Sequence, residues 1–158
     1  MTNWNQDQPI VTFLRRWVPT IFPVVHHHHP DGRGVGGYVP RTTAMGTFSA
    51  HSEGRAADIY LAAGDATERQ IGDGLFSLFI RWHSLLGVAH VIWNRQIWSA
   101  AQGGPRTYPG ANPHTDHVHV AFTRAGSQRQ PTALIPLLDG LCLDVYGTLT
   151  NQDRVPPR

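Results

Sequence analysis

The chain has 158 residues, of which 41% are hydrophobic and only 15% are charged, and its formal net charge at pH 7 is +2. This composition is too apolar and too weakly charged for an intrinsically disordered chain, and the length suits a single domain with a hydrophobic core. Every Lys or Arg position is an arginine, and no cluster exceeds the Arg15–Arg16 pair, so the sequence gives only weak support for nucleic-acid binding.

Cysteine content and hydropathy exclude disulfide-bonded, cysteine-zinc and membrane-spanning classes of protein. Cys142 is the only cysteine, so the chain has no internal disulfide and no cysteine-based zinc site, and its apolar surroundings predict a small core residue. No segment reaches the roughly 18 apolar residues of a membrane span. The N-terminal stretch lacks the basic and then apolar pattern of a signal peptide, so the protein is expected either to act in the cytoplasm or to be delivered by other means.

The first third of the chain is predicted to contain little regular structure. A short helix is expected over roughly 10–17, followed by an extended stretch that is broken by prolines. Residues 30–32, Pro-Asp-Gly, are a turn signal, and the glycines after them indicate a loop. The tract His26–His29 is interpreted as a strand end or a solvated loop, with metal binding as the less favoured alternative.

In the middle of the chain, the sequence pattern predicts a strand over 56–62 and then a long helix. Asp65 or Thr67 can cap this helix, and Gly87 can end it. His83 falls on the same helix and is expected to lie at the surface or behind a ligand rather than to bind an ion. The helix is indicated by an apolar stripe at helical spacing, formed by Ile71, Leu75, Leu78, Phe79, Trp82, Leu85 and Leu86.

The remaining elements are shorter. Two strands over 88–94 and 95–100 are predicted to flank a turn, and 101–113 is a loop. A strand over 117–123 alternates polar and apolar residues, as a half-buried strand does. The apolar segment 133–146 is predicted to be a helix or a strand that packs on the core.

Two stretches, "SAHSEGRAADIY" (49–60) and "HTDHVHVAF" (114–122), gather side chains that can bind a metal ion. Alternation along a strand points His117 and His119 to the same side. His51 and Asp58 can share an ion only if the chain bends between them, and Gly54 can provide that bend. The candidate ligands are therefore His51, Asp58, His114, Asp116, His117 and His119.

The same stretches resemble the motifs of a known superfamily. Ser-x-His-Ser-x-Gly-x-Ala-x-Asp-Ile at 49–59, followed by Asp-His-x-His-Val at 116–120, resembles the zinc D-Ala-D-Ala carboxypeptidases and L-alanyl-D-glutamate endopeptidases of bacterial cell walls. The Hedgehog signalling domain shares their fold. The resemblance covers about 37–123. It implies an α+β fold, with a small antiparallel sheet and flanking helices, in a single zinc peptidase domain over 1–158.

The resemblance also implies a cofactor and a mechanism. Zn²⁺ would be bound by His51, Asp58 and His119. Asp116, at a position where the family usually has Glu, would be the general base, and His117 would line the site or stabilise the transition state. The reaction would be metal-assisted hydrolysis, in which zinc activates water and polarises the scissile carbonyl while Asp116 accepts and later returns a proton.

Further positions are assigned to the substrate by the same resemblance: Tyr38, Arg41, Ser49 and His114. Arg41, upstream of the first ligand, would bind a substrate carboxylate or carbonyl oxygen, and it is counted with Asp116 and His117 as catalytic because either Arg41 or His117 would stabilise the oxyanion. Ser49 would contact substrate or a ligand, and His114 would border the cleft. Glu53 and Arg55 fall at variable positions of the first motif and are expected to be exposed to solvent.

The implied function is hydrolysis of peptide bonds in the stem peptides or cross-links of peptidoglycan. The partner would be the wall peptide, with no nucleic acid and no membrane span. Action at the cell wall or in the periplasm would require a holin, a secretion system or a place in a larger secreted protein. An antibacterial toxin of this kind would also have an immunity protein.

Two other classes of function stay open. A non-catalytic zinc-binding module of the same fold would be favoured by loss of the acid at position 116, which is present. A metal-dependent nuclease would need an arginine patch with interleaved aromatic residues, and the chain offers only Arg95 between Trp93 and Trp98.

Overall fold

The structure is a computed structural model that describes residues 2–28, 32, 34–40 and 49–147. Among these residues, six strands form one antiparallel sheet in the order β1-β2-β6-β3-β4-β5. The strands are β1 (Val35–Gly36), β2 (Ala56–Tyr60), β3 (Val88–Trp93), β4 (Gln96–Ser99), β5 (Arg106–Thr107) and β6 (His117–Phe122). The predicted α+β architecture, a small antiparallel sheet with flanking helices, is confirmed.

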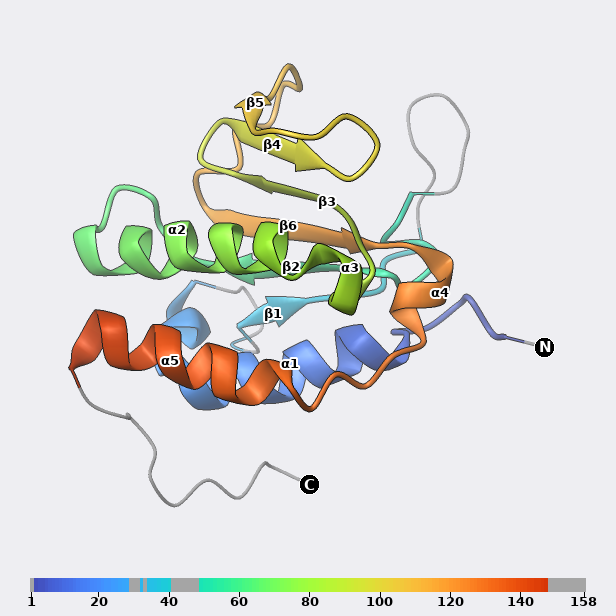
Figure 1. Ribbon diagram of the computed structural model, residues 1–158, viewed down its shortest axis with the longest axis horizontal. Coiled ribbons are helices and arrows are strands. Elements are labelled where there is room, and N and C mark those ends of the chain that lie inside the picture. Colours follow the sequence, from blue (N-terminus) through green and yellow to red (C-terminus); the bar gives the residue numbers. More distant parts are fainter. Residues whose placement is uncertain (1, 29–31, 33, 41–48, 148–158) are drawn as a thin grey trace.

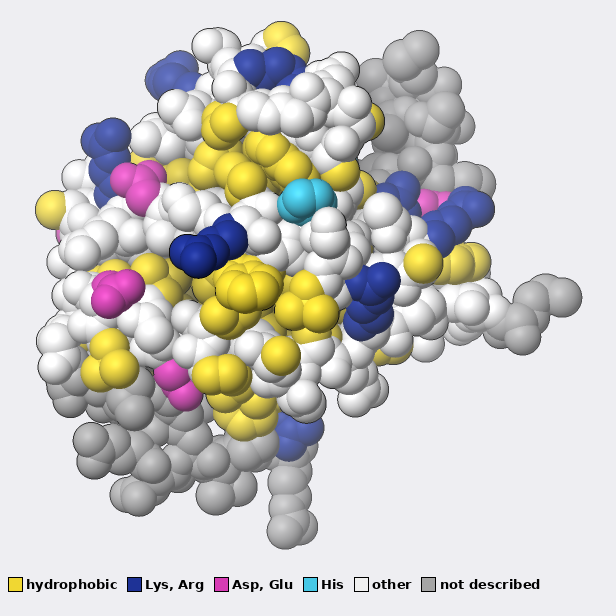
Figure 2. Space-filling model, viewed as in Figure 1, with side chains coloured by type: hydrophobic (Ala, Val, Ile, Leu, Met, Phe, Trp, Pro, Cys, Tyr) yellow, Lys and Arg dark blue, Asp and Glu magenta, His cyan; other side chains and the backbone are white. Residues whose placement is uncertain are grey.

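Helices cover one face of this sheet (Figure 1). They are α1 (Pro9–Ile21), the 3-10 helix η1 (Pro23–His27), α2 (Ala66–Arg81), α3 (His83–Leu86), α4 (Arg124–Ser127) and α5 (Leu134–Tyr146). α1 and α2 pack on the strands, and α5 contacts both of them from outside. Figure 2 shows hydrophobic side chains gathered across this helical face, with arginines around them. None of the described helices has the length and apolar character needed to cross a membrane.

The N-terminal region is more helical than predicted. α1 extends to Ile21 and holds Pro19 in its last turn, whereas the sequence predicted a helix over only 10–17. The prediction of an extended stretch after it is wrong, because η1 follows at once. Pro9 can begin α1, since the first turn of a helix leaves its N–H groups without partners inside the helix.

The described histidines of the 26–29 tract belong to η1 and its end rather than to a strand. Nδ1 of His26 bonds to the carbonyl oxygen of Gly32 at 2.7 Å. Nε2 of His28 lies 2.7 Å from Oε1 of Glu68, whose Oε2 accepts the N–H of Ala62 at 2.6 Å. His28 therefore ties η1 to the start of α2, and His29 lies outside the described residues.

The predicted long helix is interrupted near its end. α2 ends at Arg81, Trp82 leaves helical geometry with ψ 18°, and α3 follows. Asp65 caps α2 by accepting the N–H groups of Thr67 and Glu68, as the sequence indicated. Gly87, with φ +71°, ends α3 in the left-handed conformation that a glycine adopts without strain.

The elements in the second half of the chain follow the predicted order, with short strands added. β3 and β4 form the predicted hairpin, and both turn residues, Asn94 and Arg95, have positive φ, as a tight two-residue turn between twisted strands requires. β1 and β5 are short strands in regions predicted to be loops. The apolar segment near the C-terminus is the helix α5, in which Cys142 is fully buried, as predicted.

The two faces of the sheet differ in chemistry, because side chains alternate along each strand and paired residues share a face. The helix-covered face carries the buried apolar residues Ala57, Ile59, Val91, Trp93, Val118, Val120 and Phe122. The opposite face carries Asp58, Tyr60, His90, Ile92, His117 and His119. The burial of the first face thus fixes which polar groups meet on the second.

Close packing of α2 on β3 gives a stability prediction. A Cβ atom added at Gly72 would lie 2.3 Å from Cζ2 of Trp93, so Gly72→Ala should lower the free energy of unfolding by about 1–3 kcal/mol. At Gly64 an added Cβ meets no atom within 4 Å, so Gly64→Ala is the matched control and should change stability by less than about 0.5 kcal/mol. Denaturant unfolding measures both, and equal stabilities for the two variants would contradict the packing argument.

Candidate metal centre

Asp58 and His119 are brought together by strand pairing. Asp58 on β2 lies directly opposite His119 on β6, and both side chains project from the face that the helices leave open. Nδ1 of His119 is 2.8 Å from Oδ1 of Asp58. Residues that are 61 positions apart in the chain therefore form one pair of donor atoms.

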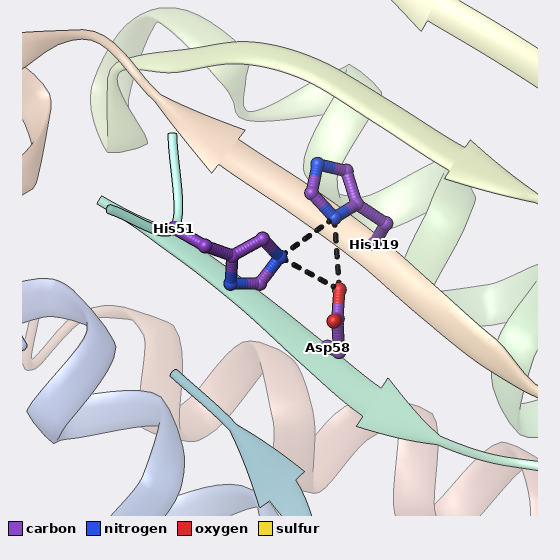
Figure 3. Close-up of side chains that lie close together, drawn as sticks. All are labelled: His51, Asp58 and His119. Atoms are coloured by element: carbon purple, nitrogen blue, oxygen red, sulfur yellow. Dashed lines mark hydrogen bonds and ion pairs between the residues drawn. The ribbon is translucent and has the colours of Figure 1, made fainter. Parts of the chain in front are cut away.

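His51 completes the group from a turn before β2 (Figure 3). Its Nε2 lies 3.2 Å from Oδ1 of Asp58 and 3.3 Å from Nδ1 of His119. The predicted bend exists, because Gly54 has φ +63° and its N–H bonds back to the carbonyl oxygen of His51 at 2.9 Å. The turn reverses the chain, so that His51 and Asp58 face each other although they are seven residues apart.

These three atoms fit a metal ion. A tetrahedral ion with bonds of about 2.0–2.1 Å, as zinc forms with nitrogen and oxygen, places its ligand atoms about 3.3 Å apart. Two of the three separations, 3.2 and 3.3 Å, already match, and the third, 2.8 Å, would need to lengthen by about 0.5 Å. The group formed by the buried His51 and the half-buried Asp58 and His119 could therefore bind a metal through two imidazoles and one carboxylate.

Each histidine of the candidate group is oriented through its other ring nitrogen. Nδ1–H of His51 donates to the carbonyl oxygen of Gly37 at 2.8 Å, which leaves Nε2 directed at the group. Nε2 of His119 lies 3.2 Å from Nε2 of His90 on β3. When His119 presents an unprotonated Nδ1 to an ion, its Nε2–H can donate to His90. Both rings thus have the outer partner that metal-binding histidines usually have.

His90 was missed by the sequence reasoning. It is the one polar side chain in the apolar strand "VAHVIW". Alternation along the predicted strand put His90 and Ile92 on the same face but did not show which residues that face meets. Nothing in the sequence indicates that β3 pairs with β6, however. That pairing sets Ala121 opposite His90 and brings the His90 ring within 5.3 Å of the His119 ring, measured between centroids.

The electrostatics favour neutral imidazoles around a single carboxylate. Burial alone would raise the pKa of the Asp58 carboxyl, but the close contacts with His119 and His51 hold that pKa well below its usual value. Burial lowers the pKa of His119 despite its contact with Asp58. Burial, together with the nearby His119, also lowers the pKa of His90 to about 4. Neutral rings keep the lone pairs that metal binding requires.

Asp116 and His117 form a pair beside this group. Nδ1–H of His117 donates to Oδ1 of Asp116 at 2.8 Å, and Nε2 of His117 lies 3.7 Å from Oδ1 of Asp58. The Asp116 side chain is 73% exposed, whereas that of His117 is only 9% exposed. The imidazole of His117 therefore stands between the Asp116 carboxylate and the candidate ligands.

The group opens into a cleft of about 710 Å³. Of the residues assigned to the substrate, Ser49 and His114 line this cleft, whereas Tyr38 is not among the described residues that do. Arg41 lies outside the described residues. The hydroxyl of Ser49 also accepts the N–H of Ser52 at 3.1 Å, so Ser49 shapes the turn that carries His51.

Tyr60 and Tyr108 also line the cleft wall, together with His114. Tyr108, from the predicted loop 101–113, sets its ring edge-on to His114 with centroids 5.0 Å apart. His114 has φ +50°, a left-handed conformation that is uncommon for residues other than glycine. Burial lowers the pKa of His114 to about 4, against the opposing hydrogen bond with the carbonyl oxygen of Asn112. His114 therefore faces the cleft as a neutral ring.

The expectation that Glu53 is solvated is wrong. Glu53 is only 7% exposed, and its carboxylate is bound by Arg124 and by Nε of Arg55, the latter at 2.5 Å. Burial would raise the pKa of Glu53, but the two arginines lower it below its usual value. Two guanidinium groups offset the cost of burying one carboxylate. Arg55 also lines the cleft and donates to the carbonyl oxygen of Phe122 at 2.8 Å.

Removal of one donor should abolish metal retention. His119→Ala leaves only His51 and Asp58 in the group, and two ligands hold an ion far more weakly than three. Dialysis of zinc-loaded protein followed by elemental analysis measures the retained metal. His27→Ala, at an exposed position of η1, is the control and should retain metal as the wild type does. Equal retention by both variants would exclude His119 as a ligand.

The outer partner His90 should tune metal affinity. His90→Ala removes the acceptor for Nε2–H of His119 and is expected to weaken zinc binding about 10–100-fold. His90→Gln offers an amide oxygen and should recover part of this loss. His83→Ala, a histidine packed against Trp98 and the helices, is the matched control. Competition with a chromophoric chelator measures each dissociation constant, and an unchanged constant for His90→Ala would contradict this role.

Comparison with known proteins adds a family assignment. The family described as "VldE, C-terminal domain" matches residues 20–119, which is more than half of the chain and includes all three members of the candidate metal group. No curated protein matches the chain, and no solved structure matches it. By sequence, this chain belongs to the family of the VldE C-terminal domain.

Proposed function

We propose that this protein is a zinc-dependent peptidase that hydrolyses peptide bonds in the stem peptides or cross-links of bacterial peptidoglycan. The observation that carries the proposal is the position of the candidate metal group. His51, Asp58 and His119 lie in an open cleft, directly beside the Asp116–His117 pair. Three protein ligands next to a solvent-accessible space are typical of catalytic zinc sites, whereas structural sites are usually closed by four.

The chemistry follows from these groups. Bound zinc would acidify a water molecule and polarise the scissile carbonyl. Asp116 is the proposed general base, and its hydrogen bond to His117 makes the two side chains one proton-handling unit. Because Asp116 holds the Nδ1 proton of His117, the Nε2 atom faces Asp58 and the reacting region. When the ring also carries a proton on Nε2, His117 can donate a hydrogen bond to negative charge that develops on the substrate.

The cleft suits a polar, extended substrate. Hydroxyl, amide and imidazole groups from Ser49, Tyr60, Tyr108, Asn112 and His114 line it and can bond to a peptide backbone or its carboxylates. Its volume of about 710 Å³ accommodates a segment of a few residues. We also propose that Arg41 binds a substrate carboxylate.

Support for the cell-wall substrate comes from the motifs. The first motif provides His51 and Asp58 and the second provides His119, in the order found in the zinc D-Ala-D-Ala peptidases, and we propose membership of that superfamily and of its Hedgehog-like fold. The proposed site of action is the cell wall or the periplasm, reached with a holin, a secretion system or a larger secreted protein. A toxin of this kind would be paired with an immunity protein.

Defined muropeptides test the proposal. The zinc-loaded protein is incubated with them with and without a chelator, and the products are identified by mass spectrometry. The proposal expects cleavage that the chelator abolishes and added zinc restores. A protein that binds zinc but yields no product in any metal state would be a non-catalytic zinc-binding module instead.

The base assignment has its own test. Asp116→Ala should retain zinc, because Asp116 is not a member of the metal group, but should lose about 10²–10⁴-fold in turnover. Asp144→Ala, an exposed carboxylate on α5, is the control and should keep wild-type turnover. Metal content is measured alongside the rate of muropeptide cleavage. Wild-type turnover by Asp116→Ala would show that another group is the base.

A further inference from the structure

One peptide group links the metal site to the N-terminal segment. The carbonyl oxygen of Gly37 accepts Nδ1–H of His51 at 2.8 Å. The N–H on the other side of the same peptide bond, which belongs to Tyr38, donates to Oδ1 of Asp7 at 2.5 Å. A carboxylate, a peptide and a candidate metal-binding histidine therefore stand in one line of hydrogen bonds.

Asp7 is itself held in place. Its second oxygen, Oδ2, pairs with Arg15 on α1, and the two side chains are only 15% and 28% exposed. Gly37 permits the close approach, because a Cβ atom there would lie 2.1 Å from Oδ1 of Asp7. A glycine at position 37 and a short acid at position 7 thus fit each other.

The same segment also contacts the turn that carries His51. The N–H of Gln8 donates to the carbonyl oxygen of Gly54 at 2.9 Å. A Cβ atom at Gly54 would lie 1.7 Å from the carbonyl oxygen of Gln6. Residues 6–8 therefore contact both the Gly37–Tyr38 peptide, which bonds to the His51 ring, and the bend at Gly54 that follows His51. They lie outside the family match, which begins at residue 20.

We propose that Asp7 is a positioning residue of the metal centre, which acts on His51 through the Gly37–Tyr38 peptide. A carboxylate on the N–H side polarises the peptide and strengthens its carbonyl as an acceptor. The stronger bond keeps the His51 proton on Nδ1 and leaves Nε2 directed at Asp58 and His119. The inference rests on the proposed zinc site but not on any peptidase activity.

The variants separate this role from a general effect on folding. Asp7→Ala removes the acceptor and the charge, whereas Asp7→Asn keeps an oxygen that can accept the N–H of Tyr38. Arg15→Met leaves Asp7 in place without its cation. Asn5→Ala, in the same segment, and Arg16→Met, an exposed neighbour on α1, are the matched controls.

Two measurements are made on the full chain. Nitrogen-15 NMR of the metal-free protein reports which ring nitrogen of His51 carries the proton, and chelator competition gives the zinc dissociation constant. Thermal unfolding identifies variants that have lost the fold. We expect Asp7→Ala to lose the fixed Nδ1–H form of His51 and to bind zinc about tenfold more weakly. Asp7→Asn and Arg15→Met should fall between it and the wild type, and the controls should match the wild type.

Two results would overturn the proposed role of Asp7. A folded Asp7→Ala with wild-type zinc affinity and an unchanged His51 tautomer would overturn it. If Asp7→Ala does not fold, wild-type values for both Asp7→Asn and Arg15→Met would overturn it equally. Failure of the proposed peptidase function would give a different pattern of results. If the wild type cleaves no muropeptide but Asp7→Ala weakens zinc binding, the peptidase proposal falls while the role of Asp7 stands.

Discussion

The candidate metal centre depends on the antiparallel register between β2 and β6. That register sets Asp58 opposite His119 on one face and Ala57 opposite Val120 on the other. A slip of one residue would turn Asp58 into the hydrophobic core and Ala57 out to the cleft. Such a slip is prevented by burial, since Ala57 and Val120 are both fully inaccessible to solvent. The packing of helices on one face of the sheet therefore fixes the distance between two candidate ligands on the other.

Around this pair, the protein restricts what each imidazole can do. His51 is directed by a backbone carbonyl and His119 by a second imidazole, so both can turn an unprotonated nitrogen toward Asp58. The low pKa of His90 keeps that ring an acceptor at neutral pH. A cation bound to this candidate group would require little reorganisation beyond a lengthening of the contact between Asp58 and His119.

The N-terminal segment has a structural reason to be part of this domain. α1 packs on β1 and β2, and the residues just before it reach the Gly37 peptide and the Gly54 turn. Two glycines allow backbone and carboxylate atoms to approach where a side chain would not fit. The family match begins at residue 20 and therefore does not include the residues that make these contacts.

Local spacing of apolar and turn residues predicted most of the elements, because these features depend on neighbouring residues. The resemblance of two motifs to a known superfamily predicted the type of fold and selected His51, Asp58 and His119 from the candidate ligands. Alternation along one strand was enough to point His117 and His119 to one side. Other features required the tertiary structure: the position of His90 beside His119, which depends on the pairing of β3 with β6, and the burial of Glu53 between two arginines. The hydrogen bonds that connect Asp7 to His51 through one peptide are a third such feature. Such contacts join residues far apart in the chain, and no local pattern of hydrophobicity or turn propensity encodes which distant groups will meet.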